Sequence, residues 1–356
     1  MKYLFLIVIG LLLNISNAHS QSKEQYNQRI SSLKNRIETD FKDPKAGLYL
    51  ETNGQNEKPF SYLWPLCALV QSANEYEVLQ SKEKYLDSVL KSIDKYYSKR
   101  PPAPGYQAYV SAEGNDSRFY DDNQWIAIAC LDAYERTHNA KYLTKAKMIY
   151  TFMMTGYDQK SGGGLYWKED EKNTKNTCSN GPGIIIALQL YKATKEEKYF
   201  QIATDLYDWT NQHLRASSGV FYDAIKIPSM KIDSATYSYN TGTMLQSNVL
   251  LYELTNEDRY LDEAKFIAKA AKSHFYTFGK LPGHYWFNVV LLRGFQALYE
   301  VEEDKERWQF FVNDAERIWN EEKDSKGLVG HKPTKTLIDQ AAMMEMYARL
   351  AEMKGV

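Results

Sequence analysis

The sequence contains few cysteines, little net charge and no apolar run long enough to cross a bilayer comfortably. Its three cysteines, Cys67, Cys130 and Cys178, are widely spaced and form no CxxC pair, so neither a disulfide framework nor a zinc site is indicated. A disulfide between Cys67 and Cys130 is an alternative that the sequence alone does not exclude. The six histidines show no ligand spacing, so no metal site is indicated. The net charge of −1 argues against nucleic-acid binding, which needs a basic surface.

The N-terminus has the pattern of an export signal. Lys2 precedes an almost wholly apolar run over residues 3–15, and residues 18–20 supply the small side chains that precede a cleavage site. We therefore expect residues 1–20 to be a signal peptide and the exported protein to be periplasmic or secreted, with no stable membrane insertion after cleavage. An uncleaved N-terminal anchor is the alternative. Neither a linker nor a shift in composition divides residues 21–356, which we expect to form a single domain.

Internal repetition is the strongest signal of architecture. Three segments, which begin at Tyr134, Tyr191 and Tyr252, align without gaps. In each segment a threonine follows the first tyrosine by three residues, a second tyrosine follows it by eight, and an alanine by twelve. The segments begin 57 and 61 residues apart, and a nearly constant period of this length predicts stacked units of secondary structure.

Each repeated unit has the pattern of two helices joined by a short polar turn. Residues 123–134 carry little charge, which is typical of a buried helix, whereas residues 141–155 are amphipathic and would face solvent on one side. The same contrast separates residues 183–191 from residues 198–213. Further candidates for inner helices span residues 60–76, 285–299 and 337–353. Six such hairpins closed in a ring predict an all-α fold, an (α/α)6 barrel, and an open solenoid is the alternative.

The inner helices are expected to begin at one end of the barrel. Glycine-containing connections, such as Gly164–Trp167 and Gly219–Tyr222, follow the outer helices and return the chain to the next inner helix. The starts of four inner helices supply carboxylates, amides, hydroxyls and aromatic rings, which together suit a sugar-binding site. These starts are the segments Phe119–Trp125, Thr177–Pro182, Tyr237–Gly242 and His284–Asn288.

The adjacent carboxylates Asp121 and Asp122 are the strongest catalytic candidates. Retaining glycosidases use two carboxyl groups about 5–5.5 Å apart. Neighbouring residues at a helix start have Cα atoms about 3.8 Å apart and side chains that point about 100° apart, so this pair can hold its carboxyls at that separation. Repulsion would raise the proton affinity of one of them, which leaves one ionised nucleophile and one protonated acid. Taken alone, the pair could instead cap a helix.

Three motifs, in this order, resemble those of glycoside hydrolase family 76, the endo-α-1,6-mannanases: Tyr120–Trp125, Cys178–Pro182 and Tyr239–Gly242. The resemblance covers nearly the whole chain after the export signal. It implies an (α/α)6 barrel that hydrolyses α-1,6-mannan with retention, without a metal ion or an organic cofactor. It also implies that Asp121 is the nucleophile and Asp122 the acid/base.

The resemblance further indicates the substrate and its contacts. We expect a monomeric enzyme whose substrate is an α-mannan polysaccharide or oligosaccharide, with cleavage inside the chain favoured. On the fifth inner helix Arg293 is kept, but a Lys-Gly stretch found in many members is absent, which affects how distant sugar units are recognised. The residues predicted to bind substrate are Tyr120, Asn123, Gln124, Trp125, Asn180, Gly181, Tyr239, Asn240, Thr241, Trp286 and Arg293.

Two other functions are compatible with the same fold. One is a different (α/α)6 carbohydrate enzyme, such as an unsaturated glucuronyl hydrolase or a sugar 2-epimerase. An epimerase would need proton-transfer groups such as paired histidines, and a uronate enzyme would need a cationic pocket, but the motif segments contain few basic residues. The other is a mannan-binding barrel without activity, against which the presence of both motif aspartates argues.

Overall fold

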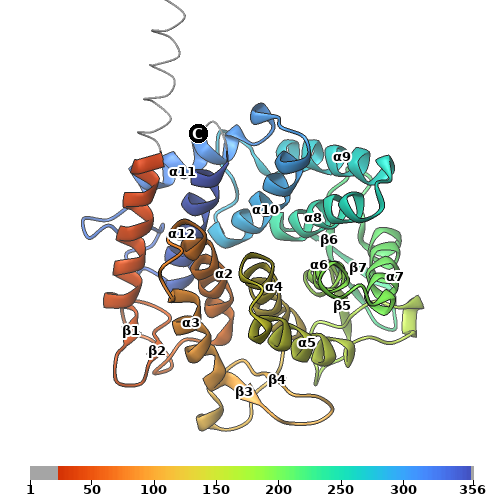
Figure 1. The fold of residues 1–356 in the computed structure, drawn as a ribbon, viewed down its shortest axis with the longest axis horizontal. Helices are drawn as coiled ribbons and strands as arrows, with labels where there is room; N and C mark the ends of the chain where they lie inside the picture. Colours follow the sequence, from red (N-terminus) through yellow and green to blue (C-terminus); the bar gives the residue numbers. More distant parts are fainter. Residues whose placement is uncertain (1–22, 354–356) are drawn as a thin grey trace, which may run out of the picture.

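In a computed structural model, which describes residues 23–353, paired helices alternate around a ring (Figure 1). The predicted signal peptide, residues 1–20, lies outside the described residues. The inner helices are α2 (Leu63–Leu79), α4 (Tyr120–Thr137), α6 (Thr177–Thr194), α8 (Ser238–Thr255), α10 (Tyr285–Val301) and α12 (Leu337–Glu352). The outer helices are residues 23–40, α3 (Tyr85–Ile93), α5 (Ala140–Met154), α7 (Glu197–Leu214), α9 (Asp258–Phe275) and α11 (Gln309–Glu321).

The ring of inner helices is closed. Each inner helix contacts the next one along the chain, and α12 contacts α2. The outer helices α3, α5, α7 and α9 each pack on the inner helix that precedes them. The predicted all-α (α/α)6 barrel is therefore confirmed, and the open solenoid is excluded.

The two rings bury their residues differently, as their sequences predict. In α8 nearly every residue over Ser238–Leu251 is buried, because other helices surround it on all sides. In α9 the buried residues form a single stripe at helical spacing, and the remaining face meets solvent. This stripe consists of Tyr260, Ala264, Ile267, Ala268, Ala271 and Phe275.

The repeated Tyr and Thr residues build the same turn in three hairpins. Helix α4 ends at Thr137, and the next residue, His138, adopts the left-handed conformation (φ 53°) and donates its backbone N–H to the carbonyl of Tyr134 at 2.7 Å. The Thr137 hydroxyl donates to the carbonyl four residues earlier at 2.6 Å and accepts the N–H of Asn139 at 3.3 Å. These bonds satisfy backbone groups that a helix end leaves free. The same pair of bonds recurs at Thr194 and Thr255.

Glycines allow three inner helices to approach one another at backbone distance. A Cβ atom at Gly242 of α8 would lie 2.5 Å from the Cα atom of Leu291 in α10. A Cβ atom at Gly294 of α10 would lie 2.7 Å from the carbonyl oxygen of Gly242, and one at Gly181 of α6 would lie 2.1 Å from Oγ1 of Thr243 in α8. Such separations are too short for a close-packed interior. Gly181, predicted to bind substrate, is thus needed where α6 and α8 meet.

Small antiparallel sheets lie in the connections, and the sequence analysis did not predict them. Strand β6 (Tyr222–Lys226) pairs with both β5 (Thr174–Asn176) and β7 (Lys231–Thr236), which joins the connection before α6 to the one before α8. The remaining strands pair as β1 (Lys42–Asp43) with β2 (Leu48–Tyr49) and β3 (Tyr97–Ser98) with β4 (Gly105–Tyr106). Short 3-10 helices are η1 (Asp94–Tyr96), η2 (Ser111–Glu113), η3 (Lys160–Gly162) and η4 (Lys305–Arg307).

All three cysteines are buried on inner helices and free, so the structure holds no Cys67–Cys130 disulfide. Cys67 lies on α2, Cys130 on α4 and Cys178 on α6. Over residues 23–353 none of the helices is long and apolar enough to cross a membrane.

Candidate active site

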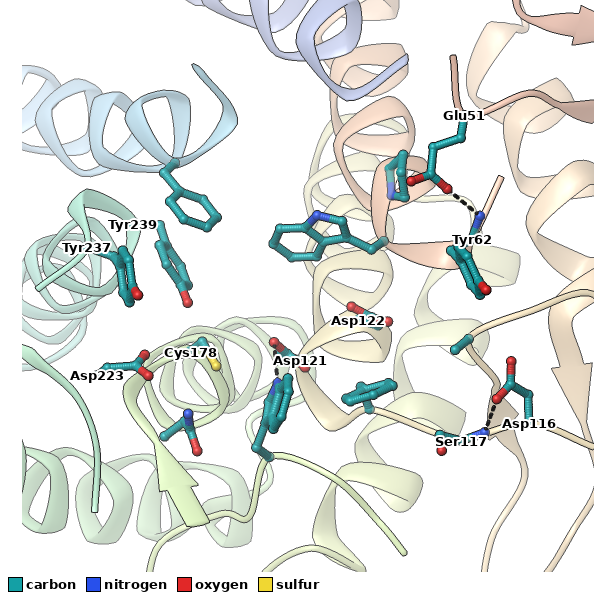
Figure 2. A pocket seen from close by; sticks show the side chains of 17 residues that line it. Glu51, Tyr62, Asp116, Ser117, Asp121, Asp122, Cys178, Asp223, Tyr237 and Tyr239 are labelled. Carbon is teal, nitrogen blue, oxygen red and sulfur yellow. Dashed lines mark hydrogen bonds between the residues drawn. The ribbon is translucent and has the colours of Figure 1, made fainter. Parts of the chain in front are cut away.

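A cavity of about 750 Å³ lies where the inner helices begin (Figure 2). The starts of five inner helices, α2, α4, α6, α8 and α10, contribute to its wall, together with the connections that precede the first four of them. The expected convergence of helix starts is therefore present, although α12 contributes no lining residue. The cavity is lined by Glu51, Tyr62, Trp64, Pro65, Ala108, Asp116, Ser117, Phe119, Asp121, Asp122, Trp167, Asn176, Cys178, Asp223, Tyr237, Tyr239 and Phe287.

Asp121 and Asp122 lie side by side in the first turn of α4. The N-cap position belongs to Phe119, whose side chain makes no capping hydrogen bond, so neither aspartate is the N-cap residue. Their side chains are only 6% and 7% exposed, yet both line the cavity. Two adjacent carboxyls that are buried without a basic neighbour are unfavourable for folding, which is typical of a functional site.

The two carboxyls differ in proton affinity because their hydrogen bonds and charged neighbours differ. Burial raises the pKa of Asp121 to about 6, even though the Cys178 thiol, the Trp167 indole N–H and nearby backbone N–H groups favour the ionised form. Burial raises the pKa of Asp122 well above its ordinary value, and the negative charge of Asp121 raises it further. Asp121 therefore loses its proton before Asp122 does.

Aromatic rings flank the carboxyl pair on two sides. On one side Phe287 contacts Tyr239 and Tyr237, with ring centroids 4.1 and 5.8 Å apart, and stacks on His284 at 3.8 Å. On the other side the rings of Phe119 and Trp167 lie 5.0 Å apart. Planar apolar faces of this kind pack well against the C–H faces of a sugar ring.

The lining carries negative charge and no basic side chain. Its five carboxyl groups belong to Glu51, Asp116, Asp121, Asp122 and Asp223, and none of the lining residues is lysine, arginine or histidine. An anionic ligand such as a uronate would therefore meet repulsion without compensation. Over residues 23–353 no group of three or more histidine, cysteine or acidic side chains could hold a metal ion.

Of the residues predicted to bind substrate, Tyr239 lines the cavity, whereas several others hold the connections in place. The Asn123 carboxamide pairs with both backbone groups of Tyr106, at 2.7 and 2.8 Å. The Asn180 carboxamide pairs in the same way with Leu165, at 2.8 and 3.1 Å. Thr241 Oγ1 accepts the Phe221 N–H at 3.2 Å. These three side chains dock a preceding connection onto the start of an inner helix, which occupies the groups that we expected to face sugar.

Most of the other aromatic and amide residues predicted to bind substrate are also buried away from the cavity. Tyr120 packs on Phe152 with centroids 5.0 Å apart, and Gln124 donates to the carbonyl of Ser179 at 2.8 Å. Trp125 and Trp286 contact each other at 5.2 Å. Asn240 lies closer, because its amide donates to the lining residue Asp223 at 3.4 Å. The aromatic residues that reach the cavity instead are Tyr62, Trp64, Phe119, Trp167, Tyr237 and Phe287.

Arg293 lies far along α10 from the helix start and meets charged partners inside the barrel. Its guanidinium donates to both carboxylate oxygens of Glu345, at 2.8 and 2.9 Å, and to Gln71. The side chain is 3% exposed and does not line the cavity. Its placement therefore indicates a role in stability in place of the predicted contact with substrate.

Some lining residues that the sequence analysis did not select had a signal in the sequence. Phe119, Tyr237 and Phe287 lie within helix-start segments already marked as convergent, and Trp167 ends a glycine-containing connection. Asp223 had no such signal, because the β6–β7 hairpin that presents it was not predicted.

Comparison with known proteins identifies the family. The family model described as "Glycosyl hydrolase family 76" matches residues 26–289, which is most of the chain. The chain belongs to glycosyl hydrolase family 76. A mannan endo-1,6-alpha-mannosidase of Saccharomyces cerevisiae is 26% identical over 64% of this chain and 53% of its own length. The chain thus spans about half the length of the curated relatives it matches.

Solved structures of family 76 proteins share the fold. A family 76 mannosidase from Bacteroides thetaiotaomicron superimposes with a TM-score of 0.85 at 26% identity, over 92% of this chain and 98% of its own. An alpha-1,6-mannanase from Salegentibacter superimposes with a TM-score of 0.80 at 26% identity, over 92% and 100% of the two chains. An inactive variant of that mannanase, in which two consecutive aspartates are replaced by asparagine, is in complex with alpha-1,6-mannotriose.

Proposed function

We propose that this family 76 protein is a retaining glycoside hydrolase that cleaves α-1,6-mannosidic bonds, with cleavage inside the mannan chain favoured. The observation that carries the proposal is the pair of buried neighbouring carboxyls, Asp121 and Asp122, in a cavity walled by aromatic rings. The Salegentibacter relative, whose variant at two consecutive aspartates is inactive and binds α-1,6-mannotriose, supports both the site and the substrate class.

The reaction uses the two carboxyls in sequence. Ionised Asp121 attacks the anomeric carbon while protonated Asp122 donates its proton to the departing glycosidic oxygen, which gives a glycosyl-enzyme with inverted configuration. Asp122, now ionised, takes a proton from water, and the resulting attack releases Asp121 and restores the α configuration. The order in which the two groups lose their protons supports this assignment of roles.

The cavity supports a neutral sugar as substrate. Aromatic faces on both sides suit pyranose rings, while the excess of carboxyl groups disfavours uronates, which weakens the case for an unsaturated glucuronyl hydrolase. A sugar 2-epimerase lacks support because the lining contains no histidine. An inactive mannan-binding protein is the second candidate, and activity decides between the two.

We also propose that export removes residues 1–20 and leaves residues 21–356 as one monomeric catalytic domain, periplasmic or secreted. The apolar run over residues 3–15 and the small residues that follow it support this proposal. Sequencing the N-terminus of the exported protein tests it, with Gln21 as the expected first residue.

Hydrolysis of linear, debranched α-1,6-mannan is the direct test of the function. We expect a series of oligosaccharides to appear early, because cleavage inside the chain yields products of many lengths. Proton NMR of the first products should show the α-anomer before mutarotation. Early β-anomer would refute retention, mannose as the sole early product would refute internal cleavage, and binding without hydrolysis would favour the inactive homologue.

The pH dependence of kcat/KM should reflect the two separated proton affinities. Asp121 must be ionised to attack, and its raised pKa of about 6 predicts an activity loss as the pH falls through that value. Asp122 must be protonated, and its raised pKa predicts a second loss of activity at higher pH than the first, as Asp122 loses its proton. Initial rates at low substrate concentration across this range check the prediction. A flat profile between acidic and neutral pH would contradict it. Because the two carboxyls interact, the apparent pKa values from the two limbs of the profile belong to the pair and not to either residue alone.

A further inference from the structure

Trp167 makes a hydrogen bond to the expected nucleophile. Its indole Nε1 donates to Asp121 Oδ2 at 3.2 Å, drawn as a dashed line in Figure 2. The second oxygen, Oδ1, is buried and has no hydrogen-bond partner within residues 23–353. The indole N–H is thus a direct side-chain donor to this carboxyl, alongside the Cys178 thiol and the backbone N–H groups that also favour its ionised form.

The backbone fixes Trp167 relative to the start of α4. The Trp167 carbonyl accepts the N–H of Tyr120 at 2.9 Å, and the Trp167 N–H donates to the Thr174 carbonyl at 3.2 Å. Two residues further on, Glu169 forms an ion pair with buried Arg118, and its N–H donates to the Arg118 carbonyl at 3.0 Å. The connection that carries Trp167 and the first turn of α4 therefore form one unit, which fixes the backbone of Trp167 relative to Asp121.

None of the titratable groups that face Asp121 supplies a positive charge. Asp122 comes from the same helix, Cys67 from α2, Cys178 from α6 and Tyr239 from α8. Asp223, from β6, lines the same cavity. The indole N–H, with its partial positive charge, and the Cys178 thiol are therefore the side-chain groups that favour a carboxylate over a carboxylic acid at Asp121.

We propose that Trp167 is a positioning residue for the nucleophile, whose indole N–H holds the Asp121 carboxylate in its ionised form and in a fixed orientation. This inference rests on the proposed function, in which Asp121 attacks and is later released. In the first step the N–H keeps Asp121 ready to attack. In the second step negative charge returns to the Asp121 oxygens as the bond to sugar breaks, and the same N–H stabilises that charge.

Trp167→Phe is the informative variant, because it keeps an aromatic ring beside Phe119 and removes the N–H donor. Loss of a hydrogen bond to a charged group predicts a decrease in kcat of about 10- to 100-fold. Slower release of Asp121 would let the glycosyl-enzyme accumulate, so KM should fall together with kcat. The acidic limb of kcat/KM should move to higher pH, because Asp121 without its donor holds its proton more tightly.

Trp209→Phe is a matched control. The Trp209 indole N–H donates to the Ser161 carbonyl at 2.8 Å, in the same connection as Trp167, and Trp209 does not line the cavity. This variant should keep the wild-type kcat, KM and pH profile. If Trp167→Phe matches the wild type, or if both variants lose activity and thermal stability equally, the proposal is wrong.

A titration without substrate separates this proposal from the proposed function. In protein labelled with 13C at aspartate carboxyls, Trp167→Phe should shift the Asp121 transition to higher pH, with the Asp121→Asn variant assigning the signal. That shift is expected even if the protein hydrolyses no mannan. An unchanged transition would overturn the role of Trp167, whether or not the enzyme is active.

Discussion

Asp121→Asn and Asp122→Asn should each nearly abolish the release of oligosaccharides from linear α-1,6-mannan. Asparagine has almost the same shape as aspartate but can neither attack the anomeric carbon as an anion nor donate a carboxyl proton. Loss of a nucleophile predicts a fall in kcat of about 10⁴-fold or more. Loss of a general acid/base predicts a fall of about 10²–10⁴-fold. Reducing-sugar release under saturating substrate measures both.

The fold of these two variants should stay intact. Burial raises the pKa of both carboxyls, so both lower the free energy of unfolding at neutral pH. Replacement by a neutral amide removes that disadvantage, and we expect a Tm equal to or above that of the wild type. Wild-type activity in both variants would refute the site, and a large fall in Tm would attribute the loss to unfolding.

Azide distinguishes the two roles on a substrate with a good leaving group. In Asp122→Ala the first step proceeds without acid, and azide attacks the glycosyl-enzyme to give an α-mannosyl azide. In Asp121→Ala azide attacks the substrate directly and gives the β-anomer. The opposite pattern of products would exchange the roles of the two aspartates.

The barrel could be predicted because its repeat consists of residues that interact with near neighbours in the sequence. Tyr134 and Thr137 close a helix end through bonds within a few residues, so the same pattern marks the same turn wherever it recurs. Closure of the ring followed from the number of units. The β6–β7 hairpin could not be predicted in this way, because its pairing carries no repeat and lies within a connection.

The position of the carboxyl pair at the cavity could be predicted, while most of its surroundings could not. Asp121 and Asp122 lie on the first turn of a helix whose direction the repeat had fixed. Asn123 and Asn180 lie close in sequence to residues that line the cavity. The backbone groups that they bind, however, belong to Tyr106 and Leu165, 17 and 15 residues earlier. A polar residue at a helix start can face either ligand or backbone, and only the path of the preceding connection decides which.

The part of the barrel away from the cavity holds a buried group of charges in which carboxyls outnumber guanidiniums. Arg293 and Arg349 meet Glu345, and Arg349 also lies 3.1 Å from Glu75. Burial raises the pKa of Asp132, which interacts with both arginines, to about 6. Each guanidinium therefore offsets more than one carboxyl, and loss of one should be severe.

Arg293→Met should lower the free energy of unfolding by about 3–5 kcal/mol, because it leaves buried carboxylates without their partner. The surviving folded protein should bind mannan with an unchanged KM, whereas a substrate-binding Arg293 would predict a raised KM. Burial raises the pKa of Asp132, and loss of the Arg293 charge would raise it further, so the deficit should shrink as the pH falls and Asp132 takes up a proton. Urea unfolding at acidic and neutral pH measures this dependence.

Two further variants make the Arg293 prediction specific. Arg259→Met removes an exposed arginine that pairs with Glu257 at 2.8 Å, and it should cost about 0–1 kcal/mol. The double variant Arg293→Met/Glu345→Met removes both partners of the buried pair and should recover part of the lost stability, since the uncompensated carboxylate is gone. If Arg293→Met lowers the free energy of unfolding no more than Arg259→Met does and also raises KM, the prediction is wrong and Arg293 contributes to substrate binding.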